Sequence, residues 1–402
     1  MPLWKRNLIV CWIGMFATGI GMSQIAPVLP LYIESLGVCD LATIKQLSGL
    51  AFGVTFIVSA IFSPIWGSAA DRFGRKPMLI RASLGMAIVI FLMGFAPNVY
   101  VLIGLRILQG VITGYGTACT TLIATQTDKA HAGFALGTLS TSSVAGSLLG
   151  PMVGGFIEYT VGLRPVFFIT GSLMFIAFLT TWLFVKENFV REEKKVLSVR
   201  EIWNEIPKKS LTISLSITFF VITLGLYSIE PIITIYVKQL VTDNLTRHVA
   251  LIAGLAFSVT GLANIITAPL LGKLSDKTGA HKVILLSLII TGIFYIPQAF
   301  VQNPGQLIAL RFLLGLTMGG LAPAVNTLIK KITPSSHTGR IFGLTMSAQY
   351  LGIFGGSVMG GQISAAFGIS AVLFVTSALM LLNATWVYFY VYKKMKNEEI
   401  YK

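Results

Sequence analysis

Charged side chains are scarce in this chain of 402 residues, and acidic ones are scarcest. Asp, Glu, Lys and Arg make up 11% of the sequence, whereas 54% is hydrophobic. With a mean hydropathy of +0.80, this composition argues against a water-soluble globular domain. Cysteine is also rare, because Cys11, Cys39 and Cys119 are the whole set. Their odd number and wide spacing indicate neither a disulfide framework nor a metal site, and we expect small packing residues.

Sequence motifs of nucleotide-dependent and zinc-dependent proteins are missing as well. There is no Gly-x-x-x-x-Gly-Lys-Ser/Thr loop, so ATP is not expected to be the direct energy source. The four histidines lie in or beside loops, and none belongs to a His-Glu-x-x-His motif. We therefore predict that the chain is not an enzyme and that it uses no cofactor and no metal.

What the sequence does contain is a series of long apolar runs. Each is long enough to cross a bilayer as a helix, for which about 20 residues are needed. The twelve runs are 7–33, 47–69, 77–96, 99–125, 134–160, 165–185, 211–237, 249–272, 282–301, 305–330, 340–367 and 370–391. They predict an all-α integral membrane protein with twelve transmembrane helices.

Basic residues are distributed unevenly between the two sides of these runs. With both termini placed in the cytoplasm, the termini and the cytoplasmic turns contain 24 of the 30 Lys and Arg residues, and the outer turns contain four. This asymmetry is a strong positive-inside signal and predicts cytoplasmic termini. We therefore attribute the net charge of +15 to orientation and to contact with anionic lipid of the bilayer, not to nucleic acid.

The second half of the chain repeats the first at an offset of 205 residues. The segment 67–76 returns as 272–281. Two related six-helix bundles facing each other across a midplane cavity are typical of secondary transporters. The repeat predicts an N-terminal bundle over 1–185 and a C-terminal bundle with a short cytoplasmic tail over 211–402.

The polar stretch 186–210 lies between the two predicted bundles. Within it, Ser198 and Glu201 have the spacing of a capping box, and apolar residues recur at helical spacing around them. We expect a cytoplasmic linker that contains a short amphipathic helix and lets the two halves move.

A charged motif occupies the cytoplasmic turn between the second and third runs. Its residues are Gly67, Asp71, Arg72, Gly74, Arg75 and Lys76, and Asp276 repeats Asp71 in the second half. The glycines allow a tight turn, and an anion beside a helix N-terminus forms a latch that favours one conformation. The alternative is an ordinary basic turn, although the cluster recurs around Asp276.

Arg106 lies within an apolar run, and Arg311 repeats it. An arginine inside the membrane costs several kcal/mol unless it is paired or hydrated, so each is a functional hypothesis by default. The alternative is a structural arginine whose donors bind backbone carbonyls.

Glycines dominate one stretch of the fifth run, which reads Gly146, Gly150, Pro151, Gly154 and Gly155 at its key positions. Glycines at this spacing make a groove for a neighbouring helix, and a proline removes one backbone hydrogen bond and kinks the span. In the second half Ser357 takes the place of Pro151. If the two segments served only as symmetric structural supports, this difference between the halves would not be needed.

Glu230 is the one acidic residue well inside an apolar run, and Pro231 follows it. An ionised carboxylate is costly there, so a protonated form is favoured, as a proton carrier requires. Two alternatives remain: Glu230 lies at the outer end of its helix and faces water, or it pairs with an arginine as a structural bridge. Glu34 and Glu158 lie nearer the outer ends, and we expect them to be solvated.

Six polar or aromatic residues within apolar spans are candidates for the lining of a substrate cavity. They are Gln24, Tyr115, Tyr227, Asn264, Asn326 and Gln349. Each is explained equally well as a polar contact between helices.

Together these motifs resemble the major facilitator superfamily, and specifically its twelve-helix drug:proton antiporter subfamily. The charged turn, the fifth-run glycines, Arg106-x-x-Gln109-Gly110 and Pro27-x-x-Pro30 all match that pattern. The opening 4–10, together with 136–141, is similar to one type of bacterial multidrug exporter. The resemblance covers nearly the whole chain.

The resemblance implies a monomeric, proton-coupled antiporter of the bacterial cytoplasmic membrane that exports small amphipathic compounds by alternating access. The alternative is a carrier of the same fold that is dedicated to one metabolite or sugar. It further implies that Asp71 and Arg75 belong to a cytoplasmic gate, that Arg106 helps in proton coupling, and that the fifth-run glycines form a hinge. Related exporters often have an acidic residue on the tenth helix, where this chain reads Thr317-Met318-Gly319-Gly320. Because this segment contains no acidic residue, a mechanism that needs a second buried carboxylate on the tenth helix does not fit this chain.

Overall fold

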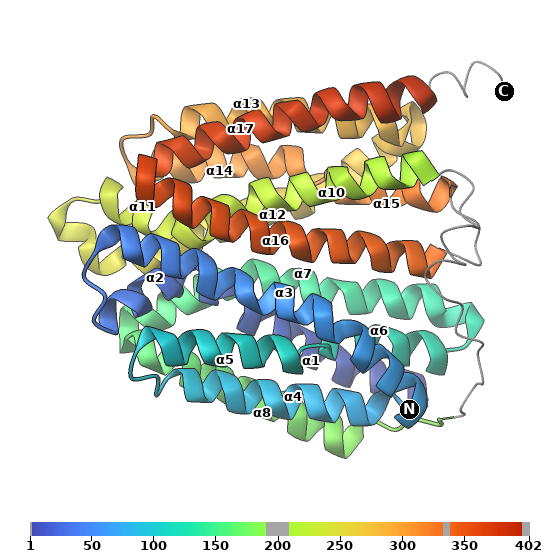
Figure 1. Cartoon of the computed structure of the whole chain (residues 1–402). Helices are drawn as coiled ribbons and strands as arrows, with labels where there is room; N and C mark the ends of the chain where they lie inside the picture. The colour runs from blue at the N-terminus through green and yellow to red at the C-terminus, as the bar shows by residue number, and fades with distance from the viewer. Residues whose placement is uncertain (1, 190–208, 333–337, 396–402) are drawn as a thin grey trace. The chain divides into compact units, whose positions relative to one another are not determined.

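A computed structural model describes residues 2–189, 209–332 and 338–395, and these residues fold into helices joined by short turns (Figure 1). Ten of the helices in these residues are long and apolar enough to cross a membrane, or eleven if one bent pair counts as a single span. The prediction of a multi-pass all-α membrane protein is therefore confirmed. The number twelve and the side of the termini stay predictions, and the helix expected around Ser198 lies outside the described residues.

The chain divides into two compact units. Unit 1 comprises residues 1–193 and 233–258, and unit 2 comprises 194–232 and 259–402. The helices before the linker are α1 (Leu3–Ser23), α2 (Ile25–Ser35), α3 (Leu41–Phe73), α4 (Arg75–Met93), α5 (Val99–Ile112), α6 (Tyr115–Gln126), α7 (Lys129–Val161) and α8 (Leu163–Phe184). Those after it are α10 (Lys209–Ile229), η1 (Glu230–Ile232), α11 (Ile233–Leu240), η2 (Asp243–His248), α12 (Val249–Thr278), α13 (Ala280–Gln298), α14 (Pro304–Met318), α15 (Leu321–Ile332), α16 (Thr338–Phe367), α17 (Ile369–Val387) and η3 (Tyr388–Tyr392). Unit 1 thus takes in α11, η2 and the start of α12.

Proline and glycine decide where the helices of unit 1 break. The α1–α2 pair bends by 44° at a break after Ser23, close to Pro27, which lacks the backbone N–H that a continuous helix would use. Another break follows α5, where Gly114 has a φ of +132°. This conformation is strained for residues that carry a Cβ, so the break is encoded locally.

The sequence repeat reappears as matching helix boundaries. Asn98 and Asn303, at the offset of 205, each cap a helix, and each side-chain oxygen accepts a hydrogen bond of 3.0 Å from a backbone N–H three residues later. Gly74 and Gly279 separate equivalent helix pairs with φ of +94° and +101°. The two halves therefore use the same local chemistry to begin and end their helices.

The interior of each unit is built from helices that contact along their length. In unit 1, α1 packs on α7 and α8, and α4 packs on α8. Cys11 and Cys119 lie free and buried in this core, whereas Cys39 is exposed. In unit 2, α10 packs on α16 and α17. The expectation that the cysteines are packing residues therefore holds for Cys11 and Cys119.

Candidate functional site

The charged turn between α3 and α4 is organised around a residue that the sequence patterns did not reveal, Glu187. Its carboxylate accepts hydrogen bonds from the backbone N–H groups of Arg75 and Lys76, at 2.9 and 2.7 Å. These groups belong to the first turn of α4, where backbone donors have no partner within the helix and the helix dipole favours an anion. Glu187 therefore occupies the helix terminus that we had considered for Asp71.

Asp71 instead pairs with a side chain of the same turn. Its carboxylate lies 2.7 Å from Nη2 of Arg75, and 75% of the Asp71 side chain is exposed. An exposed pair of this kind contributes about 0–1 kcal/mol to stability. Gly74, between them, has a positive φ, and a Cβ there would lie 3.0 Å from the Glu187 carboxylate. The turn thus holds two carboxylates, one at the helix terminus and one on its surface.

The remaining members of the charged motif lie apart from this contact. Arg72 is exposed and its guanidinium lies 5.1 Å from the Phe73 ring. Gly67 has open space where a Cβ would stand, and Asp276 is exposed at the end of α12. The structure therefore gathers Asp71, Gly74, Arg75 and Lys76, and leaves the other three without a visible part in the cluster.

Arg106 on α5 is buried, with 1% of its surface exposed. Its Nε donates to the carbonyl of Ala51 at 2.8 Å, and Nη2 donates to the carbonyl of Phe52 at 3.1 Å. Its Nη1 donates to the side-chain oxygen of Gln109 at 2.6 Å. These contacts match the structural alternative, in which carbonyls satisfy the guanidinium and tie α5 to α3. The three hydrogen bonds fix the orientation of the guanidinium between the two helices.

The glycine motif of α7 makes backbone contacts with two neighbours. Toward α1, a Cβ on Gly146 would lie 2.6 Å from the carbonyl oxygen of Phe16, and one on Gly154 would lie 2.7 Å from Gln24 Cβ. Gly150 is similarly close to Ser23. Small residues that let backbones touch are how membrane helices associate without a hydrophobic driving force.

The second neighbour of this motif is the start of α12, within unit 1. A Cβ on Gly155 would overlap the carbonyl oxygen of Ala250, and one on Gly254 would overlap that of Pro151. Nearby, the Ser258 hydroxyl donates to the carbonyl of Leu148 at 2.7 Å. Reciprocal glycines therefore seal α7 against α12 along the stretch that contains Pro151.

Polar contacts add to this closure at one end of unit 1. Lys238 of α11 donates to both carboxylate oxygens of Glu34 on α2, at 2.7 and 2.8 Å. The buried Thr234 hydroxyl donates to the carbonyl of Pro27 at 2.9 Å. Glu158 lines a neighbouring cavity of about 330 Å³ together with Arg247. Glu34 is thus paired as well as exposed, and Glu158 is half-buried rather than fully solvated.

Glu230 begins the short 3₁₀ turn η1 that follows α10, and it is half-buried. Its charge interacts with that of Arg311, which is 2% exposed. Tyr227 and Tyr295 also lie within electrostatic range of Glu230. The fully buried Tyr295 hydroxyl has no hydrogen-bond partner among the described residues. Half-burial argues against simple exposure of Glu230 to water, and Tyr295 is a neighbour that the sequence did not reveal.

Comparisons with known proteins bear on the whole of this arrangement. The family model described as Major Facilitator Superfamily matches residues 11–243 and 215–400. The chain belongs to the major facilitator superfamily. It is 47% identical over 384 residues to the multidrug resistance protein MdtG of Salmonella typhimurium, which covers 95% of each protein. MdtG of Salmonella schwarzengrund matches at the same identity and coverage.

Solved structures of the superfamily share the fold. The human organic anion transporter MFSD10 superposes with a TM-score of 0.71 at 16% identity, covering 96% of this chain and 100% of that one. A bacterial homologue of the human lysosomal transporter Spinster, inward-facing and unoccupied, gives a TM-score of 0.79 at 15% identity, covering 97% of each chain. The predicted family and its MdtG type are therefore confirmed, and the superfamily consists of carriers and not enzymes.

The six cavity candidates of this superfamily member differ in exposure. Gln24 and Tyr115 are each 1% exposed. Gln24 donates to the Thr170 hydroxyl, and the Tyr115 hydroxyl lies 2.8 Å from that of Thr181. These contacts fit helix–helix packing. The half-buried candidates are Tyr227, Asn264, Asn326 and Gln349, all in unit 2.

Proposed function

We propose that this chain is a multidrug efflux transporter that exports small amphipathic compounds in exchange for protons. The observation that carries this proposal is the 47% identity to a multidrug resistance protein across 95% of both chains. It works as a monomer in the bacterial cytoplasmic membrane, by alternating access, without nucleic acid, cofactor or metal. Two features within the apolar spans support it further: close glycine contacts between helices, and a carboxylate, Glu230, within electrostatic range of Arg311.

The proposed topology has twelve spans with both termini in the cytoplasm. The bent α1–α2 pair forms one span, and α16, which occupies the place of α7 in the second half, completes the set of twelve. The excess of Lys and Arg on the turns assigned to the cytoplasm supports this orientation. The halves 1–185 and 211–402 rock about the substrate site, with 186–210 as the linker.

In this proposal the contacts of α7 and α2 with α11 and α12 close the outer side during part of the cycle. Gly155 and Gly254 let the backbones meet, and the Glu34–Lys238 pair adds an electrostatic contact at the rim. The α7 glycines act as the hinge for separation. The charged turn around Asp71, Arg75 and Glu187 controls the opposite, cytoplasmic side.

Glu230 is the proposed proton-carrying group. Ionised, it is stabilised by the charge of Arg311, and protonation removes that attraction. One charge that crosses about 180 mV yields about 4 kcal/mol, which supports a gradient on the order of a thousandfold per proton. Arg106, whose donors are bound to α3 and Gln109, acts in this scheme by fixing the helices near the transport path.

Inside-out membrane vesicles that hold a proton gradient test the proposal. A panel of amphipathic drugs is added to the wild type, Asp71→Asn and Glu230→Gln, and a pH-sensitive dye reports the gradient. Drug-dependent collapse of the gradient in the wild type, lost in Glu230→Gln, is the expected result. If no compound acts although the protein is in the membrane, the alternative of a carrier dedicated to one metabolite or sugar replaces the proposal.

A further inference from the structure

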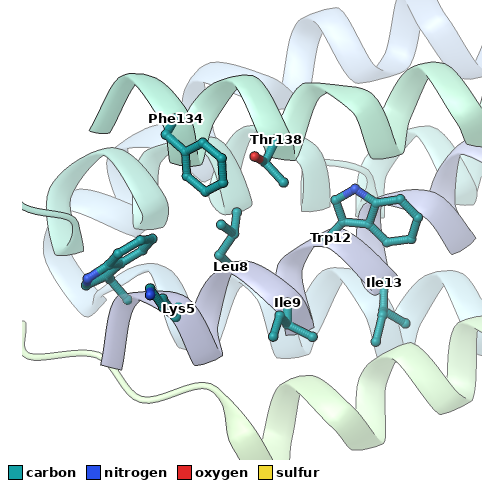
Figure 2. A pocket seen from close by; sticks show the side chains of 8 residues that line it. Lys5, Leu8, Ile9, Trp12, Ile13, Phe134 and Thr138 are labelled. Carbon is teal, nitrogen blue, oxygen red and sulfur yellow. The ribbon is translucent and has the colours of Figure 1, made fainter. Parts of the chain in front are cut away.

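A lateral groove lies along the first turns of α1, where this helix packs on α7. The groove encloses about 500 Å³ and is lined by Trp4, Lys5, Leu8, Ile9, Trp12, Ile13, Phe134 and Thr138. Figure 2 shows Phe134 and Thr138 of α7 pointing toward Leu8 of α1. The volume falls in the range of small-molecule sites, about 300–1,000 Å³. The lining is apolar apart from the Thr138 hydroxyl and, at its end, the Lys5 ammonium.

The walls of the groove are held in place by contacts behind them. The Trp4 ring stacks on His131, with centroids 5.0 Å apart. The Trp12 indole N–H donates to the Thr141 hydroxyl at 3.0 Å, and its ring stacks on Phe16 at 5.4 Å. Both indoles are therefore fixed before any ligand arrives, which lowers the entropic cost of binding.

Outward exposure distinguishes this groove from a pocket of the interior. Ile9 is 51% exposed and Phe134 is 67% exposed. Lys5, Ile9 and Ile13 follow one another at intervals of four residues, so they lie on one face of α1. This face runs from a cation at the helix start to branched apolar side chains about 12 Å deeper.

The positive charge of Lys5 determines which ligand group can bind at the end of the groove. Lys5 is exposed, and its ammonium nitrogen lies 5.4 Å from the centre of the Trp4 ring. Neither α1 nor α7 has an acidic residue in its first turn. A second groove in unit 1, of about 400 Å³ between α4 and α8, is lined by Ala87, Ile88, Phe91, Leu92, Gly171, Ser172, Phe175 and Ile176 and contains no charged side chain. Of these two grooves, therefore, only the one on α1 has a cation, Lys5, that an anionic ligand can bind.

We propose that the groove formed by α1 and α7 is a binding site for an anionic phospholipid of the bordering leaflet. The lipid phosphate lies at Lys5, at the membrane interface where tryptophan and lysine anchors are enriched. One acyl chain lies between Trp12 and Phe134, over Leu8, and extends along Ile9 and Ile13. Because α1 also packs on α8, the bound lipid stabilises the first helix of the transporter against its neighbours.

Lipid selectivity tests the headgroup contact. The full-length protein is released from vesicles of equal phosphatidylglycerol and phosphatidylcholine, and retained lipids are counted by native mass spectrometry. Replacing Lys5 with Gln lowers the ratio of retained phosphatidylglycerol to phosphatidylcholine about fivefold, the effect expected for one surface cation. Lys282→Gln removes an exposed lysine from the first turn of α13 and serves as the matched control, with an unchanged ratio. An unchanged ratio in Lys5→Gln overturns the proposal.

Fluorescence quenching locates the acyl chain. Phosphatidylglycerol brominated on its acyl chain quenches the wild type more than the Trp12→Phe variant, because bromine in the groove contacts that indole. In proteins that also carry Thr138→Phe, which fills the groove, quenching no longer depends on Trp12. In proteins that carry Ser172→Phe instead, in the uncharged groove between α4 and α8, the difference in quenching between Trp12 and Trp12→Phe remains. Equal quenching in wild type and Trp12→Phe contradicts a lipid at this site. Protection of Trp12 by an amphipathic drug, without any preference for phosphatidylglycerol, would assign the groove to substrate and also overturn the proposal.

Discussion

Replacing Glu230 with Gln separates its structural role from its role in proton coupling. Arg311 is 2% exposed and interacts electrostatically with the Glu230 carboxylate. Removing one partner of a fully buried ion pair costs about 3–5 kcal/mol. Glu230 is only half-buried, and glutamine keeps the volume and one acceptor oxygen, so we expect a loss of about 1–3 kcal/mol in unfolding free energy.

The stability assay is thermal unfolding of the purified protein in detergent, for the two single variants and the double variant. Arg311→Gln alone leaves the carboxylate without its cation and is also destabilising. The double variant Glu230→Gln/Arg311→Gln removes both charges together, so its loss is smaller than the sum of the two single losses. Additive losses would show that the two residues do not interact and would refute the pairing.

The transport assay uses the same Glu230→Gln variant in proteoliposomes. A proton-driven antiporter accumulates drug against a gradient, up to about a thousandfold for one proton at 180 mV. With the carboxylate replaced, accumulation falls to equilibration, while exchange of labelled for unlabelled drug continues because the substrate site is intact. Undiminished accumulation across the pH range would refute the assignment of Glu230 as the proton carrier.

Three further predictions concern the contacts at the two ends of unit 1. Glu187→Ala removes two charge-assisted hydrogen bonds at the start of α4, so we expect it to lower the free energy of unfolding by about 1–3 kcal/mol in a thermal unfolding assay. Glu187→Gln keeps one acceptor oxygen and recovers part of this loss. Equal losses in the two variants would contradict the capping role of Glu187. Gly155→Val places side-chain atoms on the Ala250 carbonyl, so drug efflux falls sharply with protein still in the membrane, while Gly137→Val, at a position with open space, has little effect. Glu34→Lys places a second cation beside Lys238, so we expect drug efflux to fall in drug-resistance assays. Adding Lys238→Glu restores the opposite charges and with them efflux. If the double variant does not recover efflux, the Glu34–Lys238 ion pair has no part in the transport cycle.

The sequence was most informative where local chemistry decides the structure. Apolar runs became helices because a bilayer-length segment must satisfy its own backbone hydrogen bonds. The breaks at Gly74 and Gly279, and the caps at Asn98 and Asn303, follow from residue types that adopt or stabilise those conformations. The glycine spacing on α7 indicated a helix contact, and the structure supplies α1 and α12 as the partners.

Other features depend on which distant segments lie side by side, and periodicity carries no information about that. Glu187 lies 112 residues from its partner Arg75, and nothing in the stretch 186–210 marked it as a helix cap. Tyr115 reads as a polar group inside a span, yet its hydroxyl contacts Thr181 in the core of unit 1. The Arg106 guanidinium donates to the carbonyls of Ala51 and Phe52, partners that its position within an apolar run does not reveal.

By itself, therefore, the sequence determined the membrane class, the repeat, the superfamily and the apolar segments that form the helices. These properties arise from composition and from interactions within one or two helical turns. The tertiary structure alone decided that Glu187 caps α4, that Arg311 comes within electrostatic range of Glu230, and that α1 and α7 leave a groove with a lysine at its end. Such properties require distant side chains to meet, and packing between helices, not the order of residues along them, fixes which side chains do.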